Sequence, residues 1–293
     1  MKQGQGLILK GVGSFYEVLT DNHDIRTCKA RGVFRKQGLI PTVGDRVKIE
    51  LQQSGYDLII EILPRRNLLT RPACANIDKV FLVVSASRPE PDYVLLDQLI
   101  IQAKRNGIDP FPVLNKIDEA QSGAVEHFCR TYRFFDTLIV SASSGEGMDV
   151  LRTKMEGCVS CFAGQSAVGK TSLLNSLFPD LHLEVGSLSA KTERGKHTTR
   201  HAQLVPFANG AVLDTPGFSL FEQETLEQFE LNACYPEFAL ASFPCRYPDC
   251  MHDTEPYCGI KDLVQRQVLS NERYSRYLII AKENMIRRKH RYD

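Results

Sequence analysis

The stretch Gly164-Gln165-Ser166-Ala167-Val168-Gly169-Lys170-Thr171 matches the phosphate-loop pattern G-x-x-x-x-G-K-[ST]. Such a loop surrounds phosphate oxygens with backbone N–H groups, and its two glycines allow the bends and the close approach that this needs. We expect Lys170 to reach the β- and γ-phosphates and the Thr171 hydroxyl to bind Mg²⁺. The apolar run Val159–Ala163 predicts a strand before the loop, and Lys170–Leu177 predicts a helix after it, which is the context that phosphate binding requires.

A second motif, earlier in the chain, indicates guanine. Asn115-Lys116-Ile117-Asp118 matches N-K-x-D, the guanine-recognition loop of GTP-binding proteins. The Asp118 carboxylate can accept hydrogen bonds from guanine N1–H and the N2 amino group, whereas adenine would leave it unpaired, at a cost of about 1–3 kcal/mol. Asn115 would tie the loop together, and Lys116 would cover the face of the base. Ser141-Ala142-Ser143 fits a second guanine loop, whose central N–H would donate to guanine O6.

Two further segments would contact the γ-phosphate and its metal ion. Asp214-Thr215-Pro216-Gly217 gives D-x-x-G after a short apolar run. We expect Asp214 to hold Mg²⁺ through water and the Gly217 N–H to meet the γ-phosphate. The polar loop Arg194-Gly195-Lys196-His197-Thr198-Thr199 precedes this motif, and we expect Thr199 to complete the Mg²⁺ coordination. Loops of this kind become ordered when they bind their ligand.

The chain lacks the water-positioning glutamine that Ras-like enzymes place directly after D-x-x-G, because Phe218 occupies that position. Either hydrolysis is slow or another group positions the water, and His197 is the nearest polar candidate in the sequence. A histidine in a polar loop can also be a surface residue without a catalytic role. The predicted catalytic residues are therefore His197, Lys170 and Thr199.

Along the chain the two guanine-recognition motifs come first, the phosphate loop follows, and the two segments that would contact the γ-phosphate come last. Ras-like proteins instead begin with the phosphate loop. A circular permutation preserves the spatial arrangement of a sheet while it moves the termini, so the motifs can still form one site. From about Asn67 the pattern of apolar runs alternates between strands and helices, which predicts a doubly wound α/β domain. We predict an α/β fold in which a circularly permuted P-loop GTPase domain, residues 67–222, lies between a barrel and a zinc-binding, mostly helical domain, residues 223–293.

The first 66 residues predict a small β-barrel, with the OB-fold as the leading option. The expected strands are Gly6–Lys10, Ser14–Leu19, Asp24–Ala30, Asp45–Leu51 and Tyr56–Leu63. This segment has eleven Lys and Arg against seven Asp and Glu, and the chain ends in the basic run Arg287–Arg291. Two basic ends suit a polyanionic partner, although a generic β-domain and a solvated helix end would give the same patterns.

The segment Cys245–Cys258 predicts a metal site with the spacing C-x₄-C-x-H-x₅-C. Its candidate ligands are Cys245, Cys250, His252 and Cys258. Three thiolates and one imidazole fit a closed tetrahedral site for one Zn²⁺, which would stabilise the fold and leave no position open for catalysis. The alternative is a group of cysteines that bind no metal.

The composition predicts a cytoplasmic protein of two or three domains. The chain has 293 residues, of which 43% are hydrophobic and 24% charged, and its net charge is +1. No run approaches 18 apolar residues, and the N-terminus lacks the apolar core of a signal peptide. Nine cysteines in such a chain indicate reduced thiols, a metal site or both.

Nearly the whole chain resembles the bacterial small-ribosomal-subunit-dependent GTPase family, also called RsgA or YjeQ. The run Arg194–Arg200 is typical of this family rather than of GTPases in general. The other segments that carry the resemblance are Cys28–Gly32, Val43–Val47, Arg71-Pro72, Ala75–Asp78, Asn115–Asp118, Gly164–Ser172, Asp214–Phe218, Cys245–Cys258 and Arg273–Tyr277. The chain departs from the family at Ala167 and Tyr257, where the family usually has glycine, and at Thr171, which replaces a common serine.

The resemblance implies an N-terminal OB-fold, a permuted GTPase domain and a C-terminal zinc domain. It also implies a monomer that binds the 30S subunit and its 16S rRNA, acts late in subunit maturation, and hydrolyses GTP slowly until the subunit stimulates it. His197 would then assist hydrolysis. A rival hypothesis is an RNA-binding module that uses guanine nucleotide as a structural ligand with negligible turnover, and Phe218 is the residue that favours it.

Overall fold

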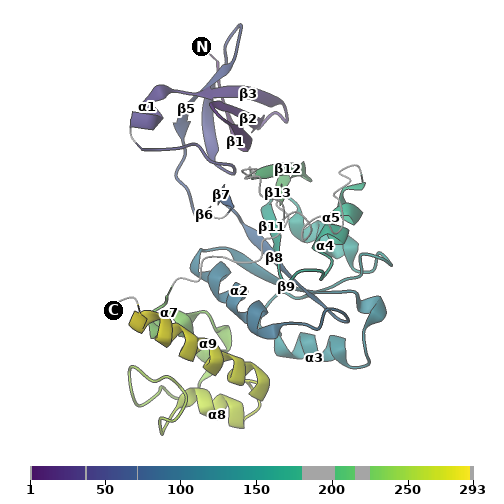
Figure 1. Cartoon of the computed structure of the whole chain (residues 1–293), viewed down its shortest axis with the longest axis vertical. Coiled ribbons are helices and arrows are strands. Elements are labelled where there is room, and N and C mark those ends of the chain that lie inside the picture. Colours follow the sequence, from purple (N-terminus) through teal and green to yellow (C-terminus); the bar gives the residue numbers. More distant parts are fainter. Residues whose placement is uncertain (1, 37, 71, 180–201, 215–224, 291–293) are drawn as a thin grey trace.

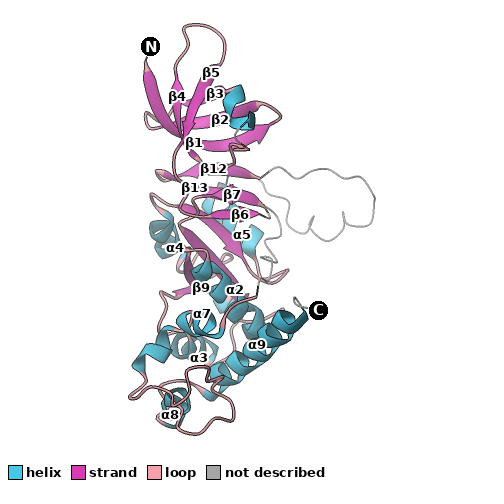
Figure 2. Ribbon diagram, turned by 90° about the vertical axis from the view of Figure 1, so that its left-hand side faces the viewer, coloured by secondary structure: helices cyan, strands magenta, loops and turns pink. Residues whose placement is uncertain are grey.

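The computed structural model describes residues 2–36, 38–70, 72–179, 202–214 and 225–290. A barrel lies at one end of the molecule, an α/β domain in the middle and a helical module at the other end (Figures 1 and 2). None of the helices in these ranges is both long and apolar enough to cross a membrane.

The N-terminal domain is the predicted five-stranded barrel. Its elements are β1 (Gln3–Val12), β2 (Phe15–Thr20), β3 (Ile25–Ala30), the short helix α1 (Gly32–Lys36), β4 (Arg46–Glu50) and β5 (Asp57–Ile62). The pairings run β1-β2-β3-β5-β4 and return from β4 to β1, so the sheet closes on itself. Alternate side chains such as Val47 and Ile49 point inward and are fully buried, as the period-two pattern predicts.

The α/β domain has a parallel sheet that is covered on both faces. Its strands are β8 (Lys79–Ser85), β9 (Asp109–Asn115), β10 (Leu138–Ile139), β11 (Val159–Ala163) and β13 (Gly210–Asp214), and β12 (Gln203–Phe207) is antiparallel to β13. The order is β10-β9-β8-β11-β13-β12. Val80 and Leu82 of β8 belong to one apolar core, whereas Phe81 and Val83 belong to the core on the opposite face. The central strand is therefore buried on both sides, as expected for a parallel sheet.

Helices connect these strands in the alternation that the sequence predicts. They are α2 (Tyr93–Arg105), the 3₁₀ turn η1 (Ile117–Glu119), α3 (Ala124–Thr131), α4 (Met148–Met155) and α5 (Lys170–Leu177). The Asp92 side chain caps α2 by accepting a hydrogen bond of 2.9 Å from the Leu95 N–H. Strand β11 and helix α5 have the bounds that the sequence predicts, so the phosphate-loop motif lies between a strand and a helix.

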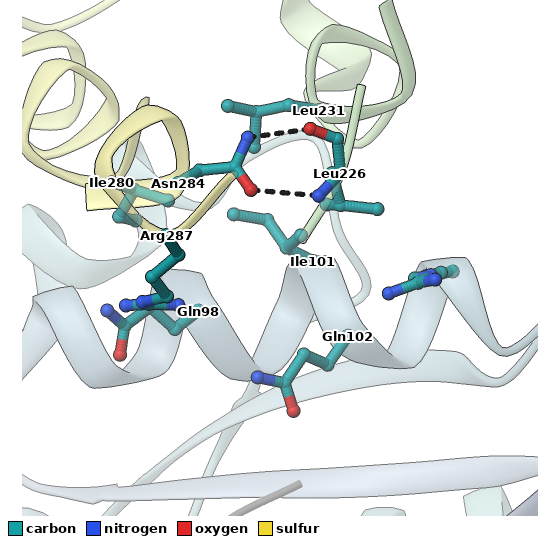
Figure 3. Close-up of a pocket in the computed structure, with 9 residues that line it drawn as sticks. Gln98, Ile101, Gln102, Leu226, Leu231, Ile280, Asn284 and Arg287 are labelled. Atoms are coloured by element: carbon teal, nitrogen blue, oxygen red, sulfur yellow. Dashed lines mark hydrogen bonds between the residues drawn. The ribbon is translucent and has the colours of Figure 1, made fainter. Parts of the chain in front are cut away.

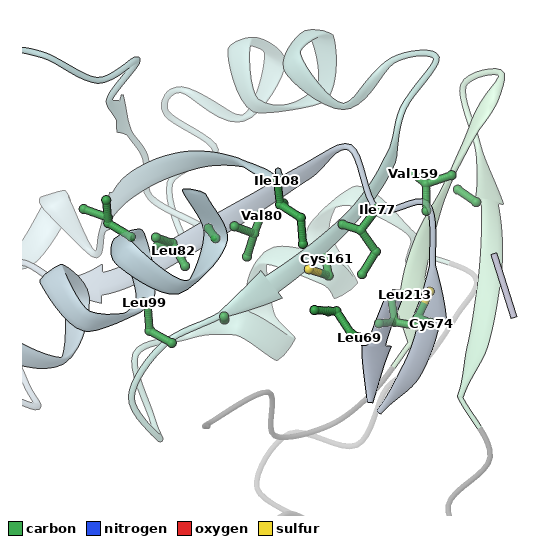
Figure 4. Close-up of a cluster of buried hydrophobic side chains, with 14 of the residues drawn as sticks. Leu69, Cys74, Ile77, Val80, Leu82, Leu99, Ile108, Val159, Cys161 and Leu213 are labelled. Atoms are coloured by element: carbon green, nitrogen blue, oxygen red, sulfur yellow. The ribbon is translucent and has the colours of Figure 1, made fainter. Parts of the chain in front are cut away.

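The barrel is joined to the α/β domain by backbone pairing. β1 pairs with β12, with Lys10 opposite Gln203, so that one sheet of eleven strands runs through both domains. A hairpin of β6 (Leu68–Thr70) and β7 (Ala73–Ala75) places Leu69 and Cys74 against the core of the α/β domain (Figure 4). The sequence analysis predicted neither the hairpin nor the pairing between β1 and β12.

One glycine makes this junction possible. Gly44 has a φ of +85°, and a Cβ atom there would lie 2.0 Å from the Ala75 carbonyl oxygen. The Asn76 amide donates to the Gly44 carbonyl at 2.9 Å, across the same contact. The barrel therefore lies directly against the hairpin, and any side chain at Gly44 would force the two apart.

The C-terminal module packs on α2. Its elements are α7 (Gln228–Ala233), the 3₁₀ helix η3 (Pro236–Leu240), α8 (Gly259–Gln265) and α9 (Asn271–His290). Ile101 of α2 and Ile280 of α9 belong to one buried cluster. Beside them, the Asn284 side chain bonds the N–H and the carbonyl of Leu226, each at 2.8 Å (Figure 3). The cavity there holds about 40 Å³, room for water and not for a ligand.

A buried ion cluster joins α2 to α9. Asp97 accepts from Arg273 Nη1 at 2.6 Å, from Arg276 Nε at 2.7 Å and from the Tyr132 hydroxyl at 2.8 Å. Arg273 Nε also pairs with Glu237 of η3. Asp97, Arg273 and Glu237 are each at most 2% exposed, so these charged groups contact one another in place of water. The segment Arg273–Tyr277, one of those that carry the family resemblance in the sequence, is the part of α9 that makes this contact.

We expect Asp97→Asn to lower the free energy of unfolding by about 3–5 kcal/mol, because it leaves two buried guanidinium groups without their shared counter-charge. Urea-induced unfolding measures this change. The control is Asp136→Asn, which breaks the exposed pair with Lys154 and should change stability by less than about 1 kcal/mol. Equal effects of the two substitutions would show that the cluster contributes no more than a surface ion pair.

Candidate functional site

The predicted nucleotide site lies at the carboxyl ends of the parallel strands. The phosphate loop follows β11, the guanine motif begins at the last residue of β9, and Asp214 is the last residue of β13. In an open α/β sheet this edge is where ligands bind. The fold therefore brings together motifs that are far apart in the chain.

Two glycines of the phosphate loop occupy positions that no other residue could take without rearrangement. Gly164 has a φ of +136°, and a Cβ there would lie 2.2 Å from the Val83 carbonyl oxygen. Gly169 has a φ of +98°, and its Cβ would lie 2.4 Å from the Asn115 amide nitrogen. The loop is thus pressed against β8 on one side and against the guanine motif on the other.

Ala167 adopts the left-handed backbone conformation, with a φ of +63°. An L-residue with a Cβ atom pays about 1–2 kcal/mol for this conformation, whereas glycine adopts it freely. Glycine would therefore fit this position of the loop without strain. In this chain the backbone at Ala167 is therefore strained.

Lys170 points back across the phosphate loop. Its Nζ donates to the carbonyl oxygens of Gly164 and Gln165, each at 2.7 Å. Burial lowers the pKa of Lys170 to about 8, and no carboxylate in the described part of the chain forms an ion pair with it. A polyphosphate would supply the missing counter-charge, which is the arrangement expected of the lysine in this motif.

Two serines hold the carboxylate that we expect to select guanine. Asp118 Oδ1 accepts from Ser141 Oγ at 2.6 Å, and Oδ2 accepts from Ser143 Oγ at 2.7 Å. The hydrogen bond from Ser141, followed by that from Ser143, lowers the pKa of Asp118. A carboxylate has about four acceptor positions, so both oxygens can still accept from a base. The sequence predicted Ser141 as part of the second guanine loop, but it did not predict this role in orienting Asp118.

Asn115 and Lys116 connect the guanine motif to the phosphate loop. The Asn115 amide donates to the Val168 carbonyl at 2.9 Å, and its oxygen accepts from the Ala142 N–H at 3.3 Å. Lys116 Nζ donates to the Ala167 carbonyl at 3.0 Å. These bonds support the prediction that Asn115 ties the loops together.

The predicted Mg²⁺ ligands lie in part within the described structure. Thr171 is the second residue of α5, and Asp214 ends β13, which neighbours β11. A hydroxyl and a carboxylate are oxygen ligands of the kind that Mg²⁺ prefers. Burial raises the pKa of Asp214, so a nearby cation would favour its charged form. His197, Thr199, Gly217 and Phe218 lie outside the described residues.

The four predicted zinc ligands come together in the C-terminal module. The ligand atoms of Cys245, Cys250, His252 and Cys258 all lie within 4.8 Å of one another. His252 Nδ1 is 3.4 Å from the sulfurs of Cys245 and Cys258, and these two sulfurs are 3.8 Å apart. Tetrahedral Zn²⁺ with bonds of about 2.3 Å to sulfur and 2.0 Å to nitrogen would space its ligands by about 3.5–3.8 Å. The cluster therefore fits one structural zinc ion.

The surroundings of the cluster also suit a metal ion. Burial lowers the pKa of His252 to about 4, so its imidazole is neutral, as a metal ligand must be. The Tyr274 hydroxyl donates to the His252 carbonyl, which fixes the backbone at this ligand to α9. Glu255 accepts from the N–H groups of Met251 at 2.7 Å and Asp253 at 3.0 Å, and thereby holds the turn in which His252 lies.

The fold and the site define a P-loop GTPase of circularly permuted order, and the comparisons with known proteins identify its family. Residues 62–224 match the family described as RsgA GTPase, and residues 5–59 match the RsgA N-terminal domain. The chain therefore belongs to the RsgA GTPase family, and it is a GTP hydrolase.

Similar proteins span the whole chain. A relative from Caldanaerobacter subterraneus subsp. tengcongensis is 39% identical over 295 residues, covering 100% of this chain and 99% of its own length. One from Ruminiclostridium cellulolyticum is 41% identical, covering 94% and 92%. Both are named small ribosomal subunit biogenesis GTPase RsgA.

Two solved structures share the fold. YjeQ from Thermotoga maritima has a TM-score of 0.86 and 33% identity, covering 97% of this chain and 99% of its own. YloQ, described as a circularly permuted GTPase, has a TM-score of 0.83 and 30% identity, covering 98% and 96%. These neighbours confirm the permuted fold that the motif order predicts.

Two tyrosines of the zinc loop provide a matched test of backbone strain. Tyr257 is 70% exposed and has a φ of +55°, whereas Tyr247 is 43% exposed and has no such strain. Both rings flank the Arg246 guanidinium, at 5.5 Å and 5.9 Å. We expect Tyr257→Gly to change the free energy of unfolding by less than about 0.5 kcal/mol or to raise it, because relief of strain offsets the added freedom of the unfolded chain.

Tyr247→Gly should instead lower the free energy of unfolding by about 1 kcal/mol, because it adds the same freedom without relieving strain. Thermal and urea unfolding of the two variants measure the difference. Equal destabilisation by both substitutions would contradict the idea that Tyr257 is strained.

Proposed function

We propose that the protein hydrolyses GTP to GDP and phosphate while it assists late maturation of the small ribosomal subunit, with stimulation by that subunit. The observation that carries the proposal is the pair of bonds from Asn115 and Lys116 to the phosphate loop. They join a guanine-selective motif to a phosphate-binding motif at one edge of the sheet. Relatives that match the chain from end to end are named for small-subunit biogenesis, which supports the assignment of the partner.

We assign the roles of the site residues as follows. GTP and GDP would contact Asn115, Lys116, Asp118, Ser141, Ala142, Gly164, Gln165, Ser166, Ala167, Val168, Gly169, Lys170, Thr171, Ser172, Asp214 and Gly217. Thr171, Thr199 and Asp214 would hold Mg²⁺, which supplies charge neutralisation to the phosphates when it is bound. His197 would position the attacking water, and Lys170 and Thr199 would stabilise the charge that develops on the γ-phosphate.

The proposed function also involves particular domains, partners and a location in the cell. The proposed domains are the OB-fold of residues 1–66, the permuted GTPase domain of residues 67–222 and the zinc-binding helical domain of residues 223–293. The 30S subunit and its 16S rRNA would be the partners of a cytoplasmic monomer. Membership of a family of GTPases favours this hydrolase over an RNA-binding module in which nucleotide has only a structural role.

We expect Asp118→Asn to weaken GTP binding by about tenfold or more and to let xanthine nucleotides compete. An amide at this position cannot accept from both guanine donors, but its NH₂ group can donate to the O2 atom of xanthine. Titration with GTP and with XTP measures how the affinity for each nucleotide changes. Asp149→Asn, on α4, is a control for loss of one acidic charge and should leave both affinities unchanged. Unchanged GTP affinity in Asp118→Asn would refute the assignment of Asp118.

Stimulation of hydrolysis should depend on His197. Because Phe218 cannot orient water, we expect the isolated protein to turn over slowly and 30S subunits to raise the rate by roughly 10³-fold. His197→Ala should keep its affinity for GTP and for the subunit and lose most of that increase. Single-turnover hydrolysis with and without 30S subunits measures both effects. If the variant is stimulated as strongly as the natural protein, another group must position the water.

A further inference from the structure

Ser143 contacts the carboxylate that we expect to select guanine, and so does Ser141. Ser143 Oγ donates to Asp118 Oδ2 at 2.7 Å, and Ser141 Oγ donates to Asp118 Oδ1 at 2.6 Å. The two serine oxygens are also 2.9 Å from each other. The two hydroxyl groups and the carboxylate therefore form a closed ring of three short contacts.

This ring has fewer protons than contacts. Each serine hydroxyl has one proton and two acceptor positions, and an ionised carboxylate has no proton to donate. Only two of the three contacts can therefore be hydrogen bonds at the same time. The N–H of Ser144 donates to Ser141 Oγ at 3.1 Å, which leaves one further acceptor position there. Because a hydroxyl proton turns to suit its surroundings, Ser143 can donate either to Asp118 or to Ser141.

The turn that carries Ser143 is held by its own backbone. The Ser141 N–H donates to the Glu146 carbonyl at 2.9 Å, and the Gly145 N–H donates to the Ser141 carbonyl at 3.0 Å. Ser141 is fully buried after β10, whereas Ser143 lies at the exposed side of the carboxylate. The hydroxyl of Ser143 is thus positioned beside Asp118 by a closed turn.

Guanine and hypoxanthine differ in one donor that would face this carboxylate. Both bases carry N1–H, but only guanine carries an amino group on C2. Guanine would therefore give Asp118 two donors, and hypoxanthine would give it one. A carboxylate oxygen that faces a base without a donor loses affinity for that base, because neither the base nor the water that it displaces pairs with the oxygen.

Ser143 can supply the donor that hypoxanthine lacks. A carboxylate oxygen accepts about two hydrogen bonds, so Asp118 Oδ2 can accept from the guanine amino group and from Ser143 together. Alternatively, Ser143 turns toward Ser141 when guanine is bound. With hypoxanthine the bond from Ser143 to Oδ2 remains, and the carboxylate stays paired on both oxygens.

We propose that Ser143 lets the site bind hypoxanthine nucleotides as well as guanine nucleotides, by donating to Asp118 Oδ2 where the guanine amino group is missing. The remaining selectivity is for N1–H, which both bases carry and adenine lacks, so ATP is still rejected. This proposal rests on the proposed function, because it takes Asp118 to be the residue that faces the base.

The test is titration of the full-length protein with GTP, with inosine triphosphate (ITP), whose base is hypoxanthine, and with ATP. We expect the natural protein to bind ITP within about tenfold of GTP and to bind ATP much more weakly. Ser143→Ala should weaken ITP binding more than GTP binding. The ratio of the two dissociation constants should rise by about 5- to 10-fold, the loss of one hydrogen bond to a charged acceptor. Ser143→Thr keeps a hydroxyl group and should keep the ratio of the natural protein.

The matched control is Ser144→Ala, at the next position of the same turn. The Ser144 hydroxyl accepts from the Glu146 N–H at 3.4 Å and, in the described part of the chain, does not bond Asp118. This control should leave the ratio of the dissociation constants unchanged, and thermal unfolding establishes that each variant is folded. The proposal is wrong if the natural protein binds ITP more than about 100-fold more weakly than GTP, or if Ser143→Ala does not change the ratio.

Asp118→Asn separates failure of this proposal from failure of the proposed function. If Asp118→Asn weakens GTP binding and Ser143→Ala leaves the ratio unchanged, Asp118 faces the base but Ser143 has no part in selectivity. If Asp118→Asn leaves the affinities for GTP and ITP unchanged, the carboxylate does not face the base. The assignment of Asp118 and the proposal for Ser143 then both fail.

Discussion

The hydrogen bond from the Asn115 amide to the Val168 carbonyl holds the guanine motif against the phosphate loop, and the arrangement of the nucleotide site depends on it. Its donor and acceptor are 53 residues apart, but Asn115 ends β9 and Val168 lies in the loop after β11, and only β8 separates these two strands in the sheet. Parallel strands bring their carboxyl ends to one edge whichever of them comes first in the chain. The site is therefore insensitive to the permuted order of its motifs.

The permutation changes what the site is attached to. The barrel pairs with β12, the strand that follows the polar loop Arg194–Thr199 in the chain. The C-terminal module begins with α7, which follows the D-x-x-G motif, and it is fixed to α2 through Asp97. A backbone pairing and a buried ion cluster thus fix the two flanking domains to the α/β domain. This is the physical advantage that we infer for the permuted order, since the segments expected to contact the γ-phosphate adjoin both flanking domains in the sequence.

The parts of the structure that the sequence could predict are those with a strong local signal. The apolar run Val159–Ala163 and the helix Lys170–Leu177 have the observed bounds, and the four metal ligands meet as their spacing predicts. The hairpin of β6 and β7 escaped prediction because strands of three residues show no periodicity. The pairing of Lys10 with Gln203 has no local signal at all, since the partners lie in different domains. The buried position of Asp97 could not be predicted from the sequence either, because a single acid within a helix usually faces solvent.

Two residues show how the fold overrides local preference. Ala167 and Tyr257 both have a Cβ atom and yet adopt positive φ angles, +63° and +55°. The phosphate loop is fixed on both sides of Ala167, by Gly164 against β8 and by Gly169 against Asn115. Tyr257 lies beside the metal ligand Cys258, and its carbonyl accepts from the Arg246 N–H at 3.2 Å. In each case contacts of the neighbouring residues determine the backbone conformation, so a residue with a Cβ atom adopts it at a cost of about 1–2 kcal/mol. At both sites the strained backbone therefore lowers stability, while the contacts of the neighbouring residues hold it in place.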